Sequence, residues 1–504
     1  MTAEIITITK EVIDAIRDAE VIGIAPRQIS LKVGIPKHEV VKKIDDLHKR
    51  GKITRIGRNL WILSKYRDIR KAHNFKTPEW YIKKFQDLYG NNLSKYNGKI
   101  TFGQNGSKRV HRWSPYIQGF SASFVDDIVH KYRISKGMKI ADPFLGSGTV
   151  PVYLKLHGID SVGIEIIPLL AFMAKVKTTW DLDVDILLNS ADHIVKAVST
   201  SSAVEDFEMP FLTNTKKHFS APVLEMLLKL RSVIIREDVD DKTRDILRLA
   251  FASILIDCSN MWRAPCLAYT DKSISKHEVC TRFIQKIRQM VEDLQYVQKH
   301  RKHWGQSEII EGNAQTYVFE PDSIDAVITS PPYNNGIDYV INYKIEMAWL
   351  GFAKSYKDLR NLRNRMVACD NISRATVREF SRSQRILNDE WIDGIVSTMG
   401  DNLKRKTISR RPDMHLVVRK YFEDIYPVFE NIHSGLKPGG FFIIVIGDSL
   451  MSGVYIPTDL ILARIGRKVG FNIESIALAR KRRSGQRRDF MLRESIVVLK
   501  KGMD

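Results

Sequence analysis

The sequence predicts an α/β protein: an open sheet with helices on both faces, preceded by a small helical domain. Three observations favour this class. A short apolar run at 139–141 leads through a glycine-containing turn into a helical pattern. A second apolar run, 324–328, stops at Ser-Pro-Pro, where two prolines remove backbone donors and end the strand. The first 66 residues show helical periodicity followed by a hairpin pattern.

Composition narrows the class of partner. A chain of 504 residues is long enough for two to four domains, and 44% hydrophobic residues are enough to build a sizeable core. The formal net charge of +21 favours a polyanionic partner, most often a nucleic acid. A generally basic surface without such a partner is the alternative.

The four cysteines form no CxxC pair, so we expect neither a metal site nor a disulfide framework. No apolar run reaches the length of a membrane span, and no signal peptide precedes the chain. We therefore expect no membrane partner and a cytoplasmic protein, associated with the nucleoid if its partner is DNA.

Residues 1–66 are expected to form three helices and a hairpin. The helices are predicted over 8–20, from Pro26 to near Gly34, and from Pro36 to Arg50, with the hairpin at 52–62. This order resembles a winged helix-turn-helix domain, whose third helix can enter a major groove. A protein–protein module is the alternative. The candidate DNA contacts are Lys37, Lys42, Lys43, Arg55 and Arg58. Residues 67–107 are polar and aromatic and are expected to be a linker.

Residues 108–180 carry a ligand-binding turn. The predicted strand ends at Asp142-Pro143-Phe144-Leu145-Gly146-Ser147-Gly148-Thr149, and a helix follows from about Val150. Glycines at such a turn let a ligand approach the backbone closely. The turn lacks the lysine of a P-loop and the third glycine of a dinucleotide fingerprint. Glu165 ends the next predicted strand, where a carboxylate can accept both hydroxyls of a ribose; a surface acid is the alternative.

Residues 306–339 carry a second candidate site. Thr329-Ser330-Pro331-Pro332-Tyr333 is a stiff loop at the carboxyl end of a strand, the edge at which open α/β sheets bind ligands. Its hydroxyl, carbonyls and aromatic ring could hold a planar base. The alternative is a turn with no role in ligand binding. Tyr339, Tyr343 and Trp349 predict a helix against this site.

Taken together, the two loops resemble the cofactor and catalytic motifs of the DNA amino-methyltransferases. That family methylates N4 of cytosine or N6 of adenine with S-adenosylmethionine. Residues 111–120 resemble the motif beside the methionine part of the cofactor, and 311–314 resemble the motif that contacts its adenine, with Asn313 in place of the usual acid. Residues 436–449 and 494–499 fit the later strands, so that 421–504 completes the core. The order of the motifs excludes the permuted arrangement in which the catalytic motif comes first.

The resemblance implies a Rossmann-like methyltransferase sheet, S-adenosylmethionine as cofactor and double-stranded DNA as partner. It implies that the base is flipped out of the duplex and stacks on Tyr333, while Ser330 and the Pro331 carbonyl accept hydrogen bonds from its amine. Ser330 favours cytosine N4, with adenine N6 as the alternative. The implied catalytic residues are Ser330, Pro331, Pro332 and Tyr333, and the implied cofactor-binding residues are Tyr116, Phe120, Asp142, Pro143, Phe144, Gly146, Gly148, Thr149, Glu165 and Asn313.

Two insertions interrupt the core, and we expect target recognition in one or both. Residues 181–305 are largely helical, for example at 243–255. Residues 340–420 are basic, with nine Lys/Arg against three acids between 354 and 387. Further basic clusters at 404–406, 410–411 and 480–483 are expected in loops that contact phosphates.

Two other functions stay open at this point. One is an RNA base methyltransferase, although no RNA-binding module is evident in the sequence. The other is a DNA-binding regulator whose methyltransferase core is inert. The resemblance also allows a cognate restriction endonuclease as a partner and leaves the oligomeric state open.

Overall fold

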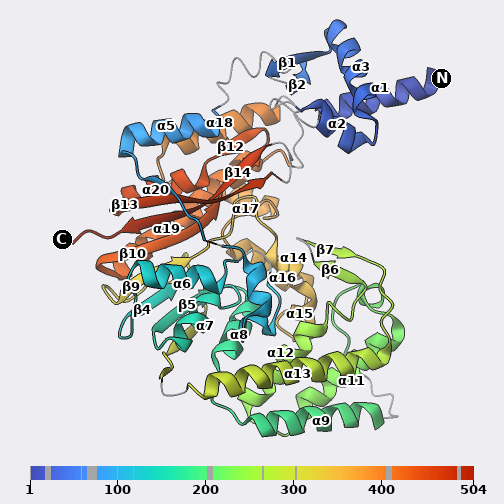
Figure 1. Cartoon of the computed structure of the whole chain (residues 1–504), viewed down its shortest axis with the longest axis vertical. Coiled ribbons are helices and arrows are strands. Elements are labelled where there is room, and N and C mark those ends of the chain that lie inside the picture. The colour runs from blue at the N-terminus through green and yellow to red at the C-terminus, as the bar shows by residue number, and fades with distance from the viewer. Residues whose placement is uncertain are drawn as a thin grey trace.

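An eight-stranded sheet forms the centre of the computed structural model (Figure 1). The structure describes residues 2–503 except 18–23, 58–59, 65–75, 99, 117–118, 201–207, 264–265, 301–302, 405–410 and 485–489. The strand order is β3-β13-β14-β10-β9-β4-β5-β8, and only the pairs made by β14 are antiparallel. The strands span β3 Leu93–Lys95, β4 Lys139–Asp142, β5 Asp160–Glu165, β8 Ser307–Glu311, β9 Ile324–Thr329, β10 Leu436–Gly447, β13 Asn472–Arg483 and β14 Met491–Lys500.

Alternation along the strands explains why both faces of the sheet are covered. Ile140, Ala326 and Ile443 belong to one apolar cluster, and their chain neighbours Ala141, Val327 and Phe442 belong to another. The first cluster includes α6 (Ala122–Lys131) and α7 (Thr149–Leu156); the second includes α19 (Met414–Gly435) and α20 (Thr458–Val469). The predicted α/β class with helices on both faces is therefore confirmed.

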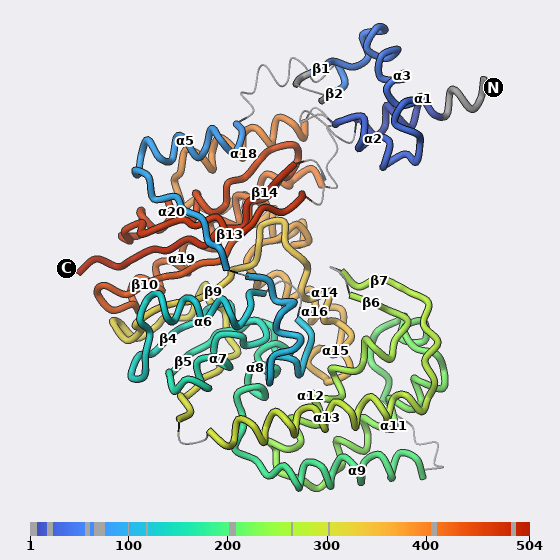
Figure 2. The backbone as a smooth tube through the Cα atoms, in the orientation of Figure 1, coloured from blue at the N-terminus to red at the C-terminus, as the bar shows by residue number. Residues whose placement is uncertain are grey.

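The N-terminal elements pack around their own apolar side chains at one end of the molecule (Figure 2). They are α1 (Thr2–Arg17), α2 (Pro26–Val33), α3 (Lys37–Lys49), β1 (Ile53–Gly57) and β2 (Leu60–Leu63). Pro26 opens α2, where a missing amide donor costs nothing, and Gly34 ends it with φ 75°. The second and third predicted helices and the hairpin are confirmed. The first helix begins earlier than predicted, and 18–20 lie outside the described residues.

The prediction of a linker at 67–107 is wrong for its described part. Residues 78–89 form helix α5, residues 93–95 form strand β3, and residues 102–107 form a 3₁₀ helix, η3. Thr77 caps α5 by accepting a hydrogen bond from the Trp80 amide, and Tyr81 and Phe85 are buried. Two of the aromatic residues in this segment thus form the apolar face of a core helix. Residues 67–75 lie outside the described part.

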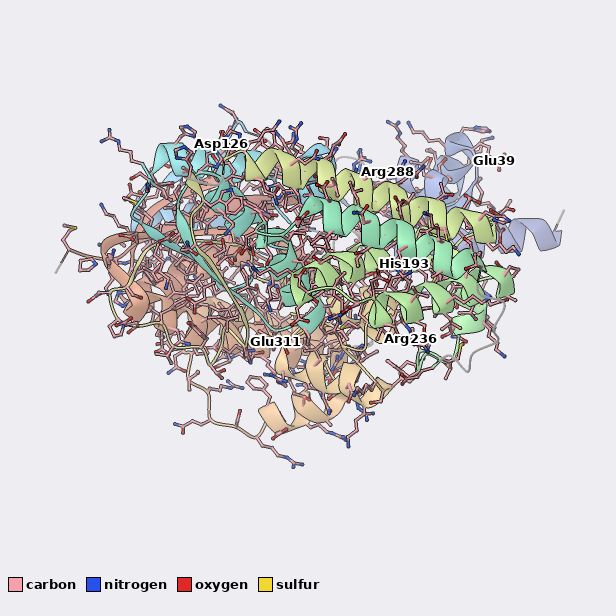
Figure 3. All side chains as sticks on the ribbon, turned by 90° about the horizontal axis from the view of Figure 1, so that it is seen from below. Glu39, Asp126, His193, Arg236, Arg288 and Glu311 are labelled. Atoms are coloured by element: carbon pink, nitrogen blue, oxygen red, sulfur yellow. The ribbon has the colours of Figure 1, made fainter. Side chains whose placement is uncertain are left out.

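The first insertion forms a helical layer with its own apolar core. Figure 3 shows α9 and α13 side by side on the underside, with His193 and Arg288 exposed on them. The predicted helix at 243–255 corresponds to α12. The elements of the insertion are α9 (Val184–Thr200), α10 (Thr215–His218), α11 (Ala221–Arg236), α12 (Asp241–Ile254), β6 (Met261–Arg263), β7 (Leu267–Tyr269) and α13 (Lys276–Gln298). Two elements that precede it, η4 (His111–Trp113) and α8 (Pro168–Thr178), contribute to the same apolar core.

The second insertion is also helical, but one of its expected phosphate contacts takes another role. Arg411 is buried, pairs with Asp413 at 2.8 Å and donates to the carbonyls of Asp370 and Ile372. Residues 480–483 belong to strand β13 and not to a loop, while 405, 406 and 410 lie outside the described residues. The elements are α14 (Tyr339–Asn342), α15 (Lys344–Trp349), α16 (Tyr356–Arg365), α17 (Arg374–Phe380) and α18 (Glu390–Lys404), with β11 (Ser449–Met451) and β12 (Val454–Ile456) near the C-terminus.

Within these described ranges no helix is long and apolar enough to cross a membrane.

Candidate active site

The two predicted loops meet at one edge of the sheet. Strands β4 and β9 are parallel neighbours, with Ile140 opposite Ala326 and Ala141 opposite Val327. At their carboxyl ends the Thr329 hydroxyl donates to Asp142 at 2.6 Å, and the Phe144 amide donates to the same carboxylate at 3.2 Å. Burial raises the pKa of Asp142 to about 7, against the opposing effect of these hydrogen bonds. A direct polar contact therefore joins residues 187 positions apart.

The turn after β4 requires glycine at two positions. Gly146 and Gly148 have φ values of 55° and 84°, which residues with a Cβ rarely adopt. A Cβ on Gly146 would lie 2.6 Å from the Tyr116 hydroxyl, and one on Gly148 would lie 3.0 Å from the Ala174 Cβ. The turn thus lies directly against Tyr116 and helix α8.

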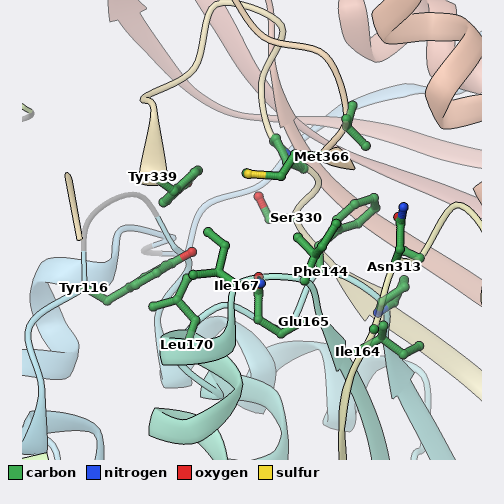
Figure 4. A pocket seen from close by; sticks show the side chains of 16 residues that line it. Tyr116, Phe144, Ile164, Glu165, Ile167, Leu170, Asn313, Ser330, Tyr339 and Met366 are labelled. Atoms are coloured by element: carbon green, nitrogen blue, oxygen red, sulfur yellow. The ribbon is translucent and has the colours of Figure 1, made fainter. Parts of the chain in front are cut away.

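A cavity opens between the two loops (Figure 4). It contains about 520 Å³ of space free of protein atoms, part of it open to solvent. Residues from both motifs line it, and so do Met366 and Val367 of the second insertion. The predicted site residues among its lining are Tyr116, Pro143, Phe144, Glu165, Asn313, Ser330 and Pro332.

Glu165 ends β5, as predicted, and its carboxylate is held by backbone amides. It accepts hydrogen bonds from Gly146 at 2.8 Å and from Ile167 at 2.9 Å. Burial raises the pKa of Glu165 to about 7, although both amide bonds favour the charged form. Ile167 also lines the cavity, so the carboxylate ties the glycine turn to the entrance of α8.

Asn313 follows β8 and connects the cavity to the second insertion. Its side-chain amide donates to the Arg365 carbonyl at 3.2 Å, and its carbonyl oxygen accepts from the Gln315 amide at 3.0 Å. Residue 365 immediately precedes Met366 and Val367. Asn313 therefore positions the segment that covers one side of the cavity.

Tyr333 lies beside the cavity and is not part of its lining. Its hydroxyl donates to Glu494 at 2.7 Å, and the Arg482 guanidinium lies 5.6 Å from its ring centroid. A Cβ on Gly447 would lie 2.7 Å from the ring, so the glycine at the end of β10 makes room for it. Burial and the neighbouring Glu494 raise the pKa of Tyr333 well above its ordinary value. Pro331 is buried between the lining residues Ser330 and Pro332.

The structure places two of the predicted cofactor-binding residues elsewhere. Phe120 packs against Phe124, with ring centroids 5.2 Å apart, in the core below α6. The Thr149 hydroxyl accepts a hydrogen bond from Asn105 at 3.4 Å and is buried at the start of α7. Both positions are neighbours of site residues in sequence, but their side chains point into the core.

Sequence reasoning placed a helix against the site but missed the aromatic stack that it forms. Tyr116 stacks with both Tyr339 and Tyr343, with ring centroids 6.0 and 6.2 Å away. The predicted helix at these tyrosines is confirmed as the short helices α14 and α15. The four-residue spacing of Tyr339 and Tyr343 in the sequence already indicated that both rings lie on the same face of a helix.

The described residues include four of the five candidate DNA contacts in the N-terminal region. Lys37 and Lys42 are exposed on α3, Lys43 is half-buried on the same helix, and Arg55 is exposed on β1. Arg58 lies outside the described residues.

Comparisons with known proteins give several relatives over most of the chain. No family model matches the chain. It is 23% identical over 483 residues to Type II methyltransferase M.BsoBI from Geobacillus stearothermophilus, covering 85% of this chain and 94% of that protein. It is 25% identical over 417 residues to Type II methyltransferase M.AvaI from Anabaena variabilis, covering 75% and 82%. A solved TehB-like SAM-dependent methyltransferase from Corynebacterium glutamicum shares 10% identity, covering 75% of this chain and 98% of that one, with a TM-score of only 0.22.

Proposed function

We propose that this chain, a homologue of type II methyltransferases, transfers a methyl group from S-adenosylmethionine to N4 of a cytosine flipped out of duplex DNA. One observation carries the proposal. The turn that resembles a donor-binding motif and the loop that resembles an acceptor-binding motif lie at adjacent strand ends. The Asp142–Thr329 hydrogen bond joins them, and one cavity is lined by both.

The residues around the cavity suit S-adenosylmethionine. Phe144 and Ile164 offer apolar walls for an adenine, and Glu165 supplies a buried carboxylate at a strand end for ribose hydroxyls. Gly146 has no Cβ, so the Tyr116 side chain can lie directly against the backbone of the turn at the side of the cavity. The cofactor, when bound, supplies an electrophilic methyl group on a positively charged sulfur.

The acceptor loop orients the attacking amine. Ser330 lines the cavity, and its hydroxyl with the Pro331 carbonyl would accept hydrogen bonds from the exocyclic amine. The Tyr333 ring would stack on the base, with its hydroxyl fixed by Glu494. Catalysis in this arrangement is mainly positioning, because two prolines hold the loop rigid. Serine at the first position of the loop supports cytosine N4 over adenine N6, following the family pattern.

DNA is supported as the acceptor polymer by charge. The chain has a formal net charge of +21, and α3 presents exposed lysines where a groove-binding helix would carry them. Duplex DNA bound there and at the cavity would release several counterions.

Transfer of tritiated methyl groups tests the proposal directly. The protein is incubated with labelled S-adenosylmethionine and either unmethylated plasmid DNA or transfer RNA, and the nucleosides are separated after digestion. We expect label in N4-methylcytosine from the plasmid. Label in N6-methyladenine would overturn the assignment of cytosine N4. Label only in RNA would overturn the assignment of DNA as the acceptor, and no label in either polymer would overturn the assignment of methyltransferase activity.

Two substitutions test the acceptor loop. Tyr333→Ala removes the stacking platform, worth about 1–3 kcal/mol per base, so transfer should fall roughly tenfold to a hundredfold. Ser330→Ala should also reduce transfer by removing a hydrogen-bond acceptor. Tyr296→Ala, on the outer side of α13, is the matched control and should leave transfer unchanged. Full transfer by both loop variants, with normal circular dichroism, would contradict the assigned roles.

A further inference from the structure

The hairpin β6–β7 leaves one face uncovered. Trp262 pairs across the strands with Ala268, and both are exposed, with the indole 50% accessible. Trp262 makes no ring, cation–π or side-chain hydrogen-bond contact with any described residue. Met261 and Arg263 point to the opposite face, where Met261 is buried. A two-stranded hairpin of this size is marginal alone, so the packed face holds it in place and leaves the tryptophan free to contact a partner.

The surroundings of the hairpin are basic. Three lysines and one acid line a groove beside it: Lys216, Lys217, Lys272 and Asp271, together with the neutral residues Asn260, Tyr269, Thr270 and Ser273. Lys216 and Lys217 are exposed on α10 and form no ion pair within the described part of the chain. Tyr269 pairs with Met261 and therefore lies on the face of the hairpin opposite Trp262. It is 54% exposed and stacks on His218 of the same short helix, with ring centroids 5.9 Å apart. An exposed aromatic ring beside unpaired lysines suits a polymer with flat bases and charged phosphates.

The hairpin is tied to the wall of the cavity (Figure 1). Arg263 donates to the Asn342 carbonyl at 2.7 Å and to the buried Glu346 carboxylate at 2.6 Å. Its guanidinium lies 4.5 Å from the ring centroid of Tyr343, which stacks on the cavity residue Tyr116. The Leu267 amide donates to the Asn342 side chain at 3.0 Å. The exposed tryptophan is thus held near the helices that follow the acceptor loop.

We infer that this hairpin is the element of the first insertion that contacts duplex DNA. Trp262 lies against the bases or sugars on one face of the hairpin, and Lys216 and Lys217, beside its other face, lie against phosphates. The inference rests on the proposed function, because it takes DNA as the substrate. It goes further by assigning the contact to one hairpin within a long helical insertion. The fixed contacts of Arg263 place that hairpin in a constant relation to the cavity.

Protection of Cys266 tests the contact without any substitution. Cys266 is exposed in the hairpin, whereas Cys280 on α13 is half-buried and serves as the internal reference. The labelling rate of each thiol by iodoacetamide is followed by peptide mass spectrometry as unmethylated plasmid DNA is added. We expect Cys266 labelling to slow several-fold and Cys280 labelling to stay constant. Unchanged Cys266 labelling on DNA that the protein demonstrably binds would overturn the inference.

Substitutions test how much each face of the hairpin contributes to DNA affinity. Trp262→Ala, and Lys216→Ser combined with Lys217→Ser, should each weaken affinity for plasmid DNA about tenfold or more while leaving S-adenosylmethionine affinity unchanged. The controls are Tyr296→Ala and Lys196→Ala, exposed on α13 and α9. If the hairpin variants bind and methylate DNA like the wild type, the hairpin assignment alone is wrong. If the wild type methylates no DNA, the proposed function fails and this inference fails with it.

Discussion

The Glu165 carboxylate accepts two backbone hydrogen bonds and is deeply buried, and the effect of burial on its pKa is the larger of the two. The amides of Gly146 and Ile167 stabilise the charged form, yet the pKa stands at about 7. A carboxyl group with a raised pKa binds more protons in the folded chain than in the unfolded chain. Its contribution to stability is therefore present below its ordinary pKa of 4.5 and is lost as the pH rises through about 7.

The same titration predicts how cofactor binding depends on pH. Glu165 changes from about one tenth ionised at pH 6 to about nine tenths ionised at pH 8. Since the carboxylate is the stronger acceptor for hydroxyl groups, affinity for S-adenosylmethionine should rise across this interval. Isothermal titration calorimetry at several pH values measures it. Glu165→Gln should flatten the dependence; an equally steep profile in that variant would move the effect to Asp142, whose pKa is also about 7.

For single residues, the sequence predicted the place along the fold better than the side-chain contacts. The glycine turn, Ser330 and Glu165 could be placed because each follows an apolar strand that is visible in the sequence. The Tyr333–Glu494 hydrogen bond could not, because it depends on how β9 and β14 are arranged around β10. The packing of Phe120 against Phe124 could not be predicted for a similar reason, since the rotation of its side chain into the core follows from tertiary packing.

Helix α5 and strand β3 show how a whole element can be missed. The helix has clear end signals, Thr77-Pro78 at its start and Gly90 at its end, but its charged residues made it read as polar. Strand β3 has only three residues and adds to the edge of the sheet by pairing Leu93 with Ile476. A strand this short carries no periodicity of its own, so only the neighbouring β13 defines it.

Substitutions in α5 distinguish a core helix from a linker. Phe85 is fully buried, so Phe85→Ala should lower the free energy of unfolding by about 3–5 kcal/mol. Leu88, on the same helix and 48% exposed, is the matched control, and Leu88→Ala should change stability by no more than about 0.5 kcal/mol. Thermal unfolding followed by circular dichroism measures both. Equal midpoints for the two variants would mean that α5 does not support the core.

For the molecule as a whole, the sequence predicted that two distant segments share one sheet edge. The prediction was possible because the motifs have a known order, and the β4–β9 pairing confirms it. The arrangement of the two insertions around that edge was beyond prediction. Their contacts, such as Asn313 with the Arg365 carbonyl, join segments that have no shared pattern in the sequence.

Removal of residues 1–66 tests how the basic charge is divided over the molecule. If Lys37, Lys42 and Lys43 each contact a phosphate, their loss should weaken plasmid binding and make the slope of log affinity against log salt shallower by about 3. The affinity for S-adenosylmethionine should not change, because no residue of this region lines the cavity. Fluorescence anisotropy across a salt series measures the slope. A truncated protein with the original slope would remove these lysines from the DNA interface.

The hydrogen bond between Asp142 and Thr329 has an evolutionary consequence. It joins the proposed donor-binding turn to the proposed acceptor-binding loop, so a shift of one displaces the other. If these roles hold, a substitution in the loop that changes the preferred nucleobase should also alter binding of the methyl donor. Substitutions that change the recognised DNA sequence should therefore accumulate in the surrounding insertions, where they leave the Asp142–Thr329 hydrogen bond intact.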